Sequence, residues 1–110
     1  MTIEDAYRAI ARNLVASIGD EEWDEAIDEI RVLDNSCRSR RWYIRNGEKI
    51  PATCDRSIEI SSASSKAVML IRDEISSSSG GRVWGVTFRL YPNGKFGIDF
   101  DYEKPDGYME

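Results

Sequence analysis

The sequence predicts an α+β domain in which an antiparallel sheet of four to five strands carries two helices on one face. Apolar residues recur at helical spacing near the N-terminus, and strict alternation runs along both arms of a hairpin near the C-terminus. The pair Asn46-Gly47 marks another hairpin between them. The expected order of elements is α-β-β-(β)-α-β-β, in one domain that spans residues 1–110.

Residues 2–19 are predicted to form the first helix. Thr2 is suited to cap it, and Asp5 stands three residues on, in the capping-box position. Gly19 is a natural stop at the C-terminal end. The apolar stripe that would face the core consists of Ile3, Tyr7, Ile10, Leu14 and Ile18.

The next segment, residues 20–29, contains seven acidic residues around Trp23. Its periodicity is compatible with a short helix or with a strand from about Ala26 to Leu33, and we favour the strand. The acidic run fits either a solvated turn and strand edge or a negative interaction patch. We expect Trp23 to be a core residue rather than an exposed interface anchor.

A first β-hairpin is predicted around Asn46-Gly47, the dipeptide that favours a tight two-residue turn. Residues 37–45 would form its first arm, and a short strand near residues 48–50 its second. Pro51 would end that strand or mark it as a sheet edge.

The second helix is predicted to begin at a serine between Ser61 and Ser65. Residues 76–81 contain only Ser and Gly, which is typical of a flexible connector. The apolar positions at helical spacing are Ala67, Leu70, Ile71 and Ile75.

A second hairpin is predicted from Val83 to Tyr102, with its turn at residues 92–94. Its apolar face would consist of Trp84, Val86, Phe88 and Leu90 on one arm and Phe96, Ile98, Phe100 and Tyr102 on the other. Lys95, Gly97, Asp99 and Asp101 would face the opposite way. One side of the sheet is therefore expected to be covered and the other to face water.

The composition excludes several kinds of site. The chain has no His, which rules out a Ser-His-Asp triad, a Cys-His pair and His-ligated zinc. Two cysteines, Cys37 and Cys54, cannot build a four-Cys metal site and are expected to be free thiols. The sequence contains no apolar run of membrane-spanning length and no secretory signal, so we expect a cytoplasmic protein.

The charge balance, 15 Lys and Arg against 20 Asp and Glu, gives a net charge of -5 and argues against a nucleic-acid partner. The dense basic stretch fits an RNA-binding strand less well than charges that protect a sheet edge. It consists of Arg38, Arg40, Arg41 and Arg45, with Arg38 and Arg40 on one strand face.

Asp99 and Asp101 stand two residues apart on one strand, so their side chains share a face. Such a pair is able to hold a divalent cation or to serve acid–base catalysis. We favour the simpler interpretation, a solvated strand face. We accordingly predict no catalytic residue, no metal site and no cofactor.

The second hairpin resembles the carboxy-terminal hairpin of the YezG-like immunity proteins, which are small bacterial antitoxins that protect a cell from polymorphic or contact-dependent toxins. The acidic Glu21-Glu22-Trp23 step resembles the family's proline-Glu-Glu-Trp step into a strand. The matching hairpin positions are Gly94, Lys95, Phe96, Ile98, Asp99, Asp101, Tyr102 and Glu103.

The resemblance implies a non-enzymatic immunity protein of the cytoplasm that occludes a cognate secreted toxin domain, expected to be a basic nuclease. An acidic inhibitor would be steered electrostatically toward such a cleft. The expected contacts are Asp99, Asp101, Glu103, Glu21, Glu22 and Asp24, with Tyr102 or Tyr108 as an aromatic anchor. The alternatives are a small acid–base or metal-dependent enzyme that uses Asp99 and Asp101, and a generic interaction adaptor that uses the strand edge near Pro51.

Overall fold

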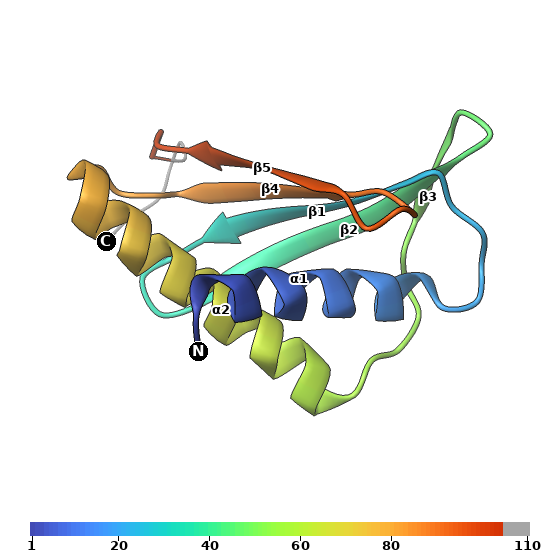
Figure 1. Cartoon of the computed structure of the whole chain (residues 1–110), viewed down its shortest axis with the longest axis horizontal. Helices are drawn as coiled ribbons and strands as arrows, with labels where there is room; N and C mark the ends of the chain where they lie inside the picture. Colours follow the sequence, from blue (N-terminus) through green and yellow to red (C-terminus); the bar gives the residue numbers. More distant parts are fainter. Residues whose placement is uncertain (105–110) are drawn as a thin grey trace.

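In the computed structural model, the described residues 1–104 form two helices and a five-stranded antiparallel sheet. The strand order in the sheet is β3-β2-β1-β4-β5. Both helices lie on the same side of the sheet, and no described helix covers the other side (Figure 1). The elements are α1 Ile3–Ile18, β1 Glu25–Val32, β2 Cys37–Arg45, β3 Glu48–Pro51, α2 Ile58–Ser79, β4 Gly85–Leu90 and β5 Phe96–Asp101. The predicted α+β class is confirmed.

The ends of α1 are set by the residues that the sequence indicated. The Asp5 N–H donates to the Thr2 hydroxyl at 3.1 Å, and the Thr2 N–H donates to the Asp5 carboxylate at 3.0 Å. This reciprocal capping box satisfies two backbone donors that the first helical turn leaves without partners. Gly19 caps the C-terminal end, where its N–H donates to the Val15 carbonyl.

The start of α2 differs from the prediction. The helix begins at Ile58 and is capped by the Ser57 hydroxyl, which accepts from the Ile60 N–H at 3.2 Å. The predicted start between Ser61 and Ser65 was therefore wrong. Ile58 is 85% exposed, so the apolar residue that begins the helix does not belong to the stripe that faces the core. The apolar periodicity therefore does not indicate the first turn.

The end of α2 also differs, because the helix continues through Ser79 and is capped by Gly80 in a left-handed conformation. The predicted flexible connector over residues 76–81 was wrong. The Ser78 and Ser79 hydroxyls donate to the carbonyls of Glu74 and Ile75 at 3.0 and 2.8 Å, one turn back along the helix. Serine is therefore accommodated in this turn by bonds to the helix backbone.

The predicted strands of the first half of the chain are confirmed. β1 is a strand rather than a helix, and it pairs with β2 on one side and with β4 on the other. The β2–β3 turn places Asn46 at φ 51° and Gly47 at φ 79°. Positive φ at both central residues is the geometry of a tight two-residue hairpin turn, and it explains the Asn-Gly pair.

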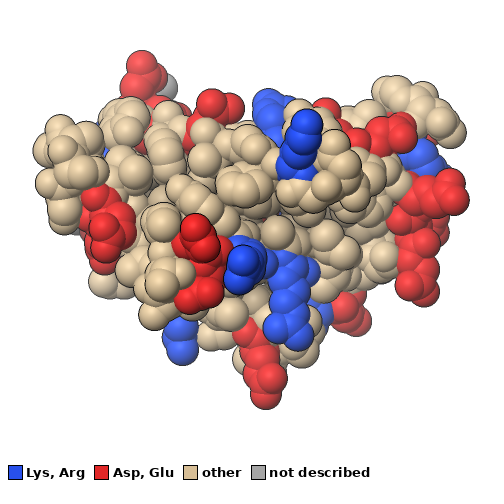
Figure 2. Space-filling view, in the orientation of Figure 1, with Lys and Arg blue, Asp and Glu red and all other residues tan. Residues whose placement is uncertain are grey.

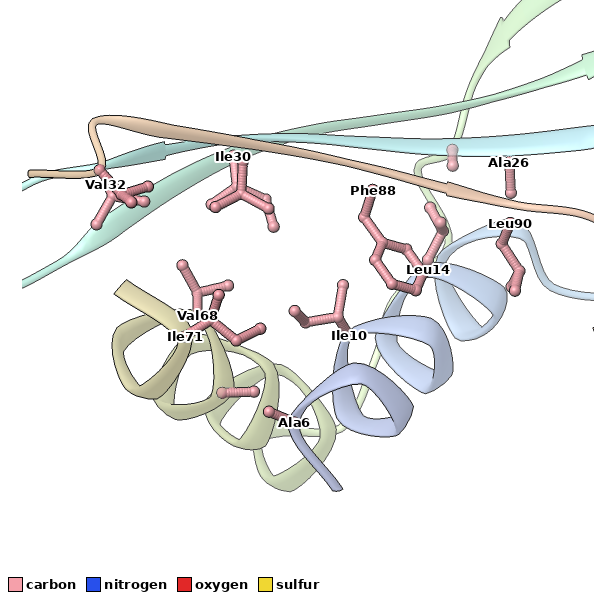
Figure 3. Packing of buried hydrophobic residues seen from close by; sticks show 14 of the residues in the cluster. Ala6, Ile10, Leu14, Ala26, Ile30, Val32, Val68, Ile71, Phe88 and Leu90 are labelled. Carbon is pink, nitrogen blue, oxygen red and sulfur yellow. The ribbon is translucent and has the colours of Figure 1, made fainter. Parts of the chain in front are cut away.

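The core lies between the helices and the sheet (Figure 3). Ile10 and Leu14 of α1 approach Phe88 of β4, and Val68 and Ile71 of α2 lie beneath the other end of the sheet. Trp23 is partly buried and packs against this core, as expected. Within residues 1–104, no helix combines the length and the apolar character needed to cross a membrane.

Candidate functional site

The face of the sheet without helices carries its charged side chains in rows across the strands. In one row, Arg38 of β2 lies opposite Arg31 of β1, which lies opposite Gly85 of β4 and then Asp101 of β5. Because paired residues of antiparallel strands point to the same side, this row is basic at the β2 end and acidic at the β5 end.

The neighbouring row has the same polarity at its two ends. Arg40 lies opposite Glu29, and Glu29 lies opposite Thr87, which in turn lies opposite Asp99. The helix-free face is therefore divided in charge, with arginines toward β2 and carboxylates along β5. The fold confirms that Arg38 and Arg40 share a face.

Asp99, Asp101 and Glu103 form what we call the acidic β5 stripe, and all three residues are exposed. Alternate residues of a strand are about 6.5–7 Å apart, so Asp99 and Asp101 present adjacent charges from a paired strand. The Glu103 N–H donates to the Asp101 carboxylate at 2.9 Å, which holds the chain beyond the strand against its last residue.

The other predicted acidic contacts lie elsewhere, at the end of the molecule that carries the β2–β3 hairpin (right in Figures 1 and 2). Glu21 forms an ion pair with Arg45 at 2.8 Å, and the Asp24 carboxylate accepts from the Asn46 N–H at 3.0 Å. The Asp24 N–H donates to the Ile44 carbonyl. Ile44 is four to six residues along β2 from the rows of the stripe, about 13–20 Å.

The predicted contacts thus form two separate acidic groups, and Glu22, which is exposed, belongs with Glu21 and Asp24. Tyr102 is 50% exposed, but its ring lies beside Gly81, just after α2. It follows Asp101 in the chain and alternates away from the two aspartates. Tyr108 lies outside the described residues.

Trp84 departs from the predicted alternation. The core includes Val83 as well as Val86, Phe88 and Leu90, whereas Trp84 lines a groove on the helix-free face. The Trp84 N–H donates to the Asp101 carbonyl at 2.7 Å, although Asp101 already lies opposite Gly85. Two residues opposite one make a β-bulge, and a bulge reverses the alternation of side chains.

The groove next to the acidic stripe encloses about 960 Å³. Gly85 opens it, because a side chain there would fill the middle of the row between Arg31 and Asp101. A Cβ added at Gly85 would lie 3.2 Å from the Asp101 Cβ. The charged residues of its lining are Glu29, Arg31, Arg38, Arg40, Asp101, Glu103 and Lys104.

The sequence interpretation missed a buried carboxyl group on the helix-covered face, near two partly buried arginines. Asp28 is fully buried there, and neither of its carboxylate oxygens has a hydrogen-bond partner in the described part of the chain. Burial raises its pKa from 3.8 to about 6, while the nearby positive charges of Arg41 and Arg56 act in the opposite direction. Burial also lowers the pKa of the Arg41 guanidinium.

Among the described residues, no group of three or more His, Cys, Asp or Glu is placed to hold a metal ion. Cys37 and Cys54 are free thiols, as expected. No model of a known protein family matches this chain, and none of the curated proteins searched is significantly similar to it.

Proposed function

We propose that the chain is an immunity protein that neutralises a basic toxin domain by stoichiometric binding in the cytoplasm. The acidic β5 stripe carries the proposal. It lies on the β4–β5 hairpin, the segment whose sequence resembles the YezG-like immunity proteins, and its three carboxylates are exposed. The expected partner is a secreted toxin domain with nuclease activity.

The stripe has the physical properties that recognition of a cationic surface requires. β5 is paired with β4 along its whole length, so Asp99 and Asp101 are presented from a hydrogen-bonded strand rather than from a loop. A preorganised contact loses less conformational entropy on binding. Clustered negative charge also accelerates encounter with a positive surface at low ionic strength.

Occlusion then follows from charge and shape. A nuclease cleft binds phosphates with Lys and Arg side chains, and a row of carboxylates offers these side chains the same charge. An inhibitor held over the cleft prevents substrate from entering, and this mechanism requires no reaction at the inhibitor.

Rescue from the partner toxin tests this proposal in cells. The proposal predicts that a gene next to the one for this chain encodes a large secreted protein, and the variable C-terminal domain of that protein is the toxin domain to use. We expect cells that induce this domain to survive when they co-express the chain and to die with an empty vector. Equal killing in both cultures contradicts the proposal, and protection against an unrelated toxin domain contradicts its specificity.

Titration of the purified toxin domain separates an inhibitor from an enzyme. If the chain acts by occlusion, toxin activity falls linearly and reaches its minimum at one chain per toxin molecule. If the chain destroys its target by turnover, small amounts abolish the activity with time. The second outcome would replace the binding proposal with the acid–base or metal-dependent alternative.

A further inference from the structure

β5 forms an open edge of the sheet, with β4 as its only strand neighbour within residues 1–104. The strand has six residues and contains neither proline nor lysine. The opposite edge, β3, has only four residues and ends at Pro51, which cannot donate a backbone hydrogen bond. Of the two edges, β5 is therefore the one that another strand can extend.

The direction of the free backbone groups follows from the pairing with β4. The Tyr91 N–H donates to the Lys95 carbonyl at 2.9 Å, which directs the odd-numbered residues of β5 toward β4. Backbone groups of an antiparallel strand point alternately to its two sides. Phe96, Ile98 and Phe100 therefore direct their N–H and C=O groups away from the sheet.

The same three residues carry apolar side chains that the helices cover incompletely. The helices pack mainly against β1 and β2 and leave the β5 margin less protected. Phe96 remains 46% exposed although its ring contacts Tyr7 and stacks on Phe88. Ile98 and Phe100 are half-buried. The edge thus offers an apolar strip on one side and the acidic stripe on the other.

We propose that β5 is a docking edge on which an extended segment of the partner adds as a sixth strand. Backbone bonds to Phe96, Ile98 and Phe100 would hold the segment. Its alternate side chains would be Lys or Arg beside Asp99 and Asp101 and apolar beside the partly exposed strip. This inference rests on the proposed function, since the segment belongs to the neutralised toxin domain.

A second copy of this chain fits the edge poorly. Antiparallel pairing of two β5 strands about a two-fold axis would bring the carboxylates of Asp99 and Asp101 close to those of the second copy. Like charges on paired strands are destabilising, and charged residues commonly protect natural sheet edges in this way. The same carboxylates attract a segment that carries Lys or Arg, so the edge discriminates between the two occupants.

NMR titration of the ¹⁵N-labelled full chain tests the edge directly. The probe is the capped peptide Lys-Val-Arg-Val-Lys-Val-Arg, and the control peptide has Glu at every Lys and Arg position. We expect the amide protons of Phe96, Ile98 and Phe100 to exchange slowly only when the basic peptide is present. The affinity of the acidic peptide should be lower than that of the basic peptide by at least about tenfold. Equal binding of both peptides, protection elsewhere or no binding overturns the proposal.

A pair of substitutions at Ile98 separates backbone pairing from side-chain contact. Ile98→Pro removes one outward N–H but leaves the backbone groups that face β4, as proline at a strand edge permits. Ile98→Ala keeps that N–H and removes most of the side chain. We expect the proline variant to lose peptide binding by about tenfold relative to the alanine variant. Circular dichroism of both variants verifies that the fold is retained.

The two variants also distinguish failure of the edge from failure of the function. Loss of rescue by Ile98→Pro, with rescue retained by Ile98→Ala, supports strand addition. Rescue by both variants overturns strand addition and leaves the immunity function standing. Failure of the natural sequence to rescue overturns the proposed function, and the peptide titration then decides the edge alone. If the natural chain forms a dimer and Ile98→Pro abolishes it, a second copy of the chain occupies the edge. That result would overturn the choice of a toxin segment as the occupant.

Discussion

Asp28 lies directly opposite Arg41 in the pairing of β1 with β2, on the side of the sheet that the helices cover. The Asp28 side chain is fully excluded from solvent, and its carboxylate oxygens have no hydrogen-bond partner among residues 1–104. The fold therefore favours the neutral form of this carboxyl group. A buried group of this kind reduces stability at neutral pH, where it is ionised.

The first prediction concerns Asp28→Asn, which makes the group permanently neutral. The folded pKa of Asp28, about 6, lies above its ordinary value of 3.8, so its contribution to stability is complete below pH 3.8 and is lost as pH rises through 6. We expect the variant to be more stable than the natural chain by about 1–3 kcal/mol near pH 7.5, and by less near pH 4. Urea unfolding at the two pH values measures the difference. A variant that is less stable at both would contradict this account.

The second prediction concerns the opposite member of the pair. Arg41 lowers the pKa of Asp28, so Arg41→Met removes a compensating charge and leaves the carboxylate more isolated. We expect this variant to lose about 1–3 kcal/mol of stability near pH 7.5 and less near pH 4, where Asp28 is protonated in the folded state. Arg8→Met, on an exposed face of α1, is the matched control. Equal losses at both pH values would show that Arg41 acts only through packing.

Asp28 also shows which features of the fold could be predicted from the sequence. Ala26, Asp28, Ile30 and Val32 alternate along β1, so the pattern already placed the carboxyl group on the apolar face. The surrounding run of acids concealed this, because it suggested a solvated segment. Local signals were most reliable where one residue type has one strong structural preference, as at Thr2 and at Asn46-Gly47.

Other features depend on contacts that alternation does not specify. The bulge at Trp84 arises from pairing with Asp101, a residue 17 positions away, so strict alternation along β4 misplaced the side chain. The separation of the acidic candidates into two groups follows from strand order, which the sequence did not define. The resemblance covers the second hairpin and the Glu21-Glu22-Trp23 step, and it does not include the arginines that share the helix-free face with the hairpin.

The third prediction compares two glycines on the helix-free face. A Cβ at Gly85 would lie 3.2 Å from the Asp101 Cβ, whereas a Cβ at Gly97 would meet no atom within 4 Å. We expect Gly85→Ala to destabilise the chain by about 1 kcal/mol and to weaken partner binding, because Asp101 must shift. Gly97→Ala should be neutral or slightly stabilising, since it restricts the unfolded chain. Thermal unfolding of both variants measures this, and a larger loss for Gly97→Ala would contradict it.

The fourth prediction concerns ionic strength. If carboxylates of the stripe steer the encounter, the association rate with the toxin domain should fall by at least about tenfold between about 0.02 and 0.5 M salt. The dissociation rate should change much less. Stopped-flow mixing measures the two rates separately. An association rate that is independent of salt would contradict a role for the stripe in encounter.

The most direct test of the account is the affinity of an Asp99→Lys/Asp101→Lys variant for the toxin domain, measured by calorimetry. The control is Glu48→Lys/Asp55→Lys, which changes the net charge by the same amount. Glu48 is in β3, the other edge strand of the sheet, and Asp55 follows β3 in the chain. We predict that reversal on β5 weakens binding by about a hundredfold or more, and the control by less than about tenfold, with both variants folded. If the β5 variant binds the toxin domain as tightly as the natural chain, or if both variants lose affinity equally, the result would contradict binding through the acidic stripe.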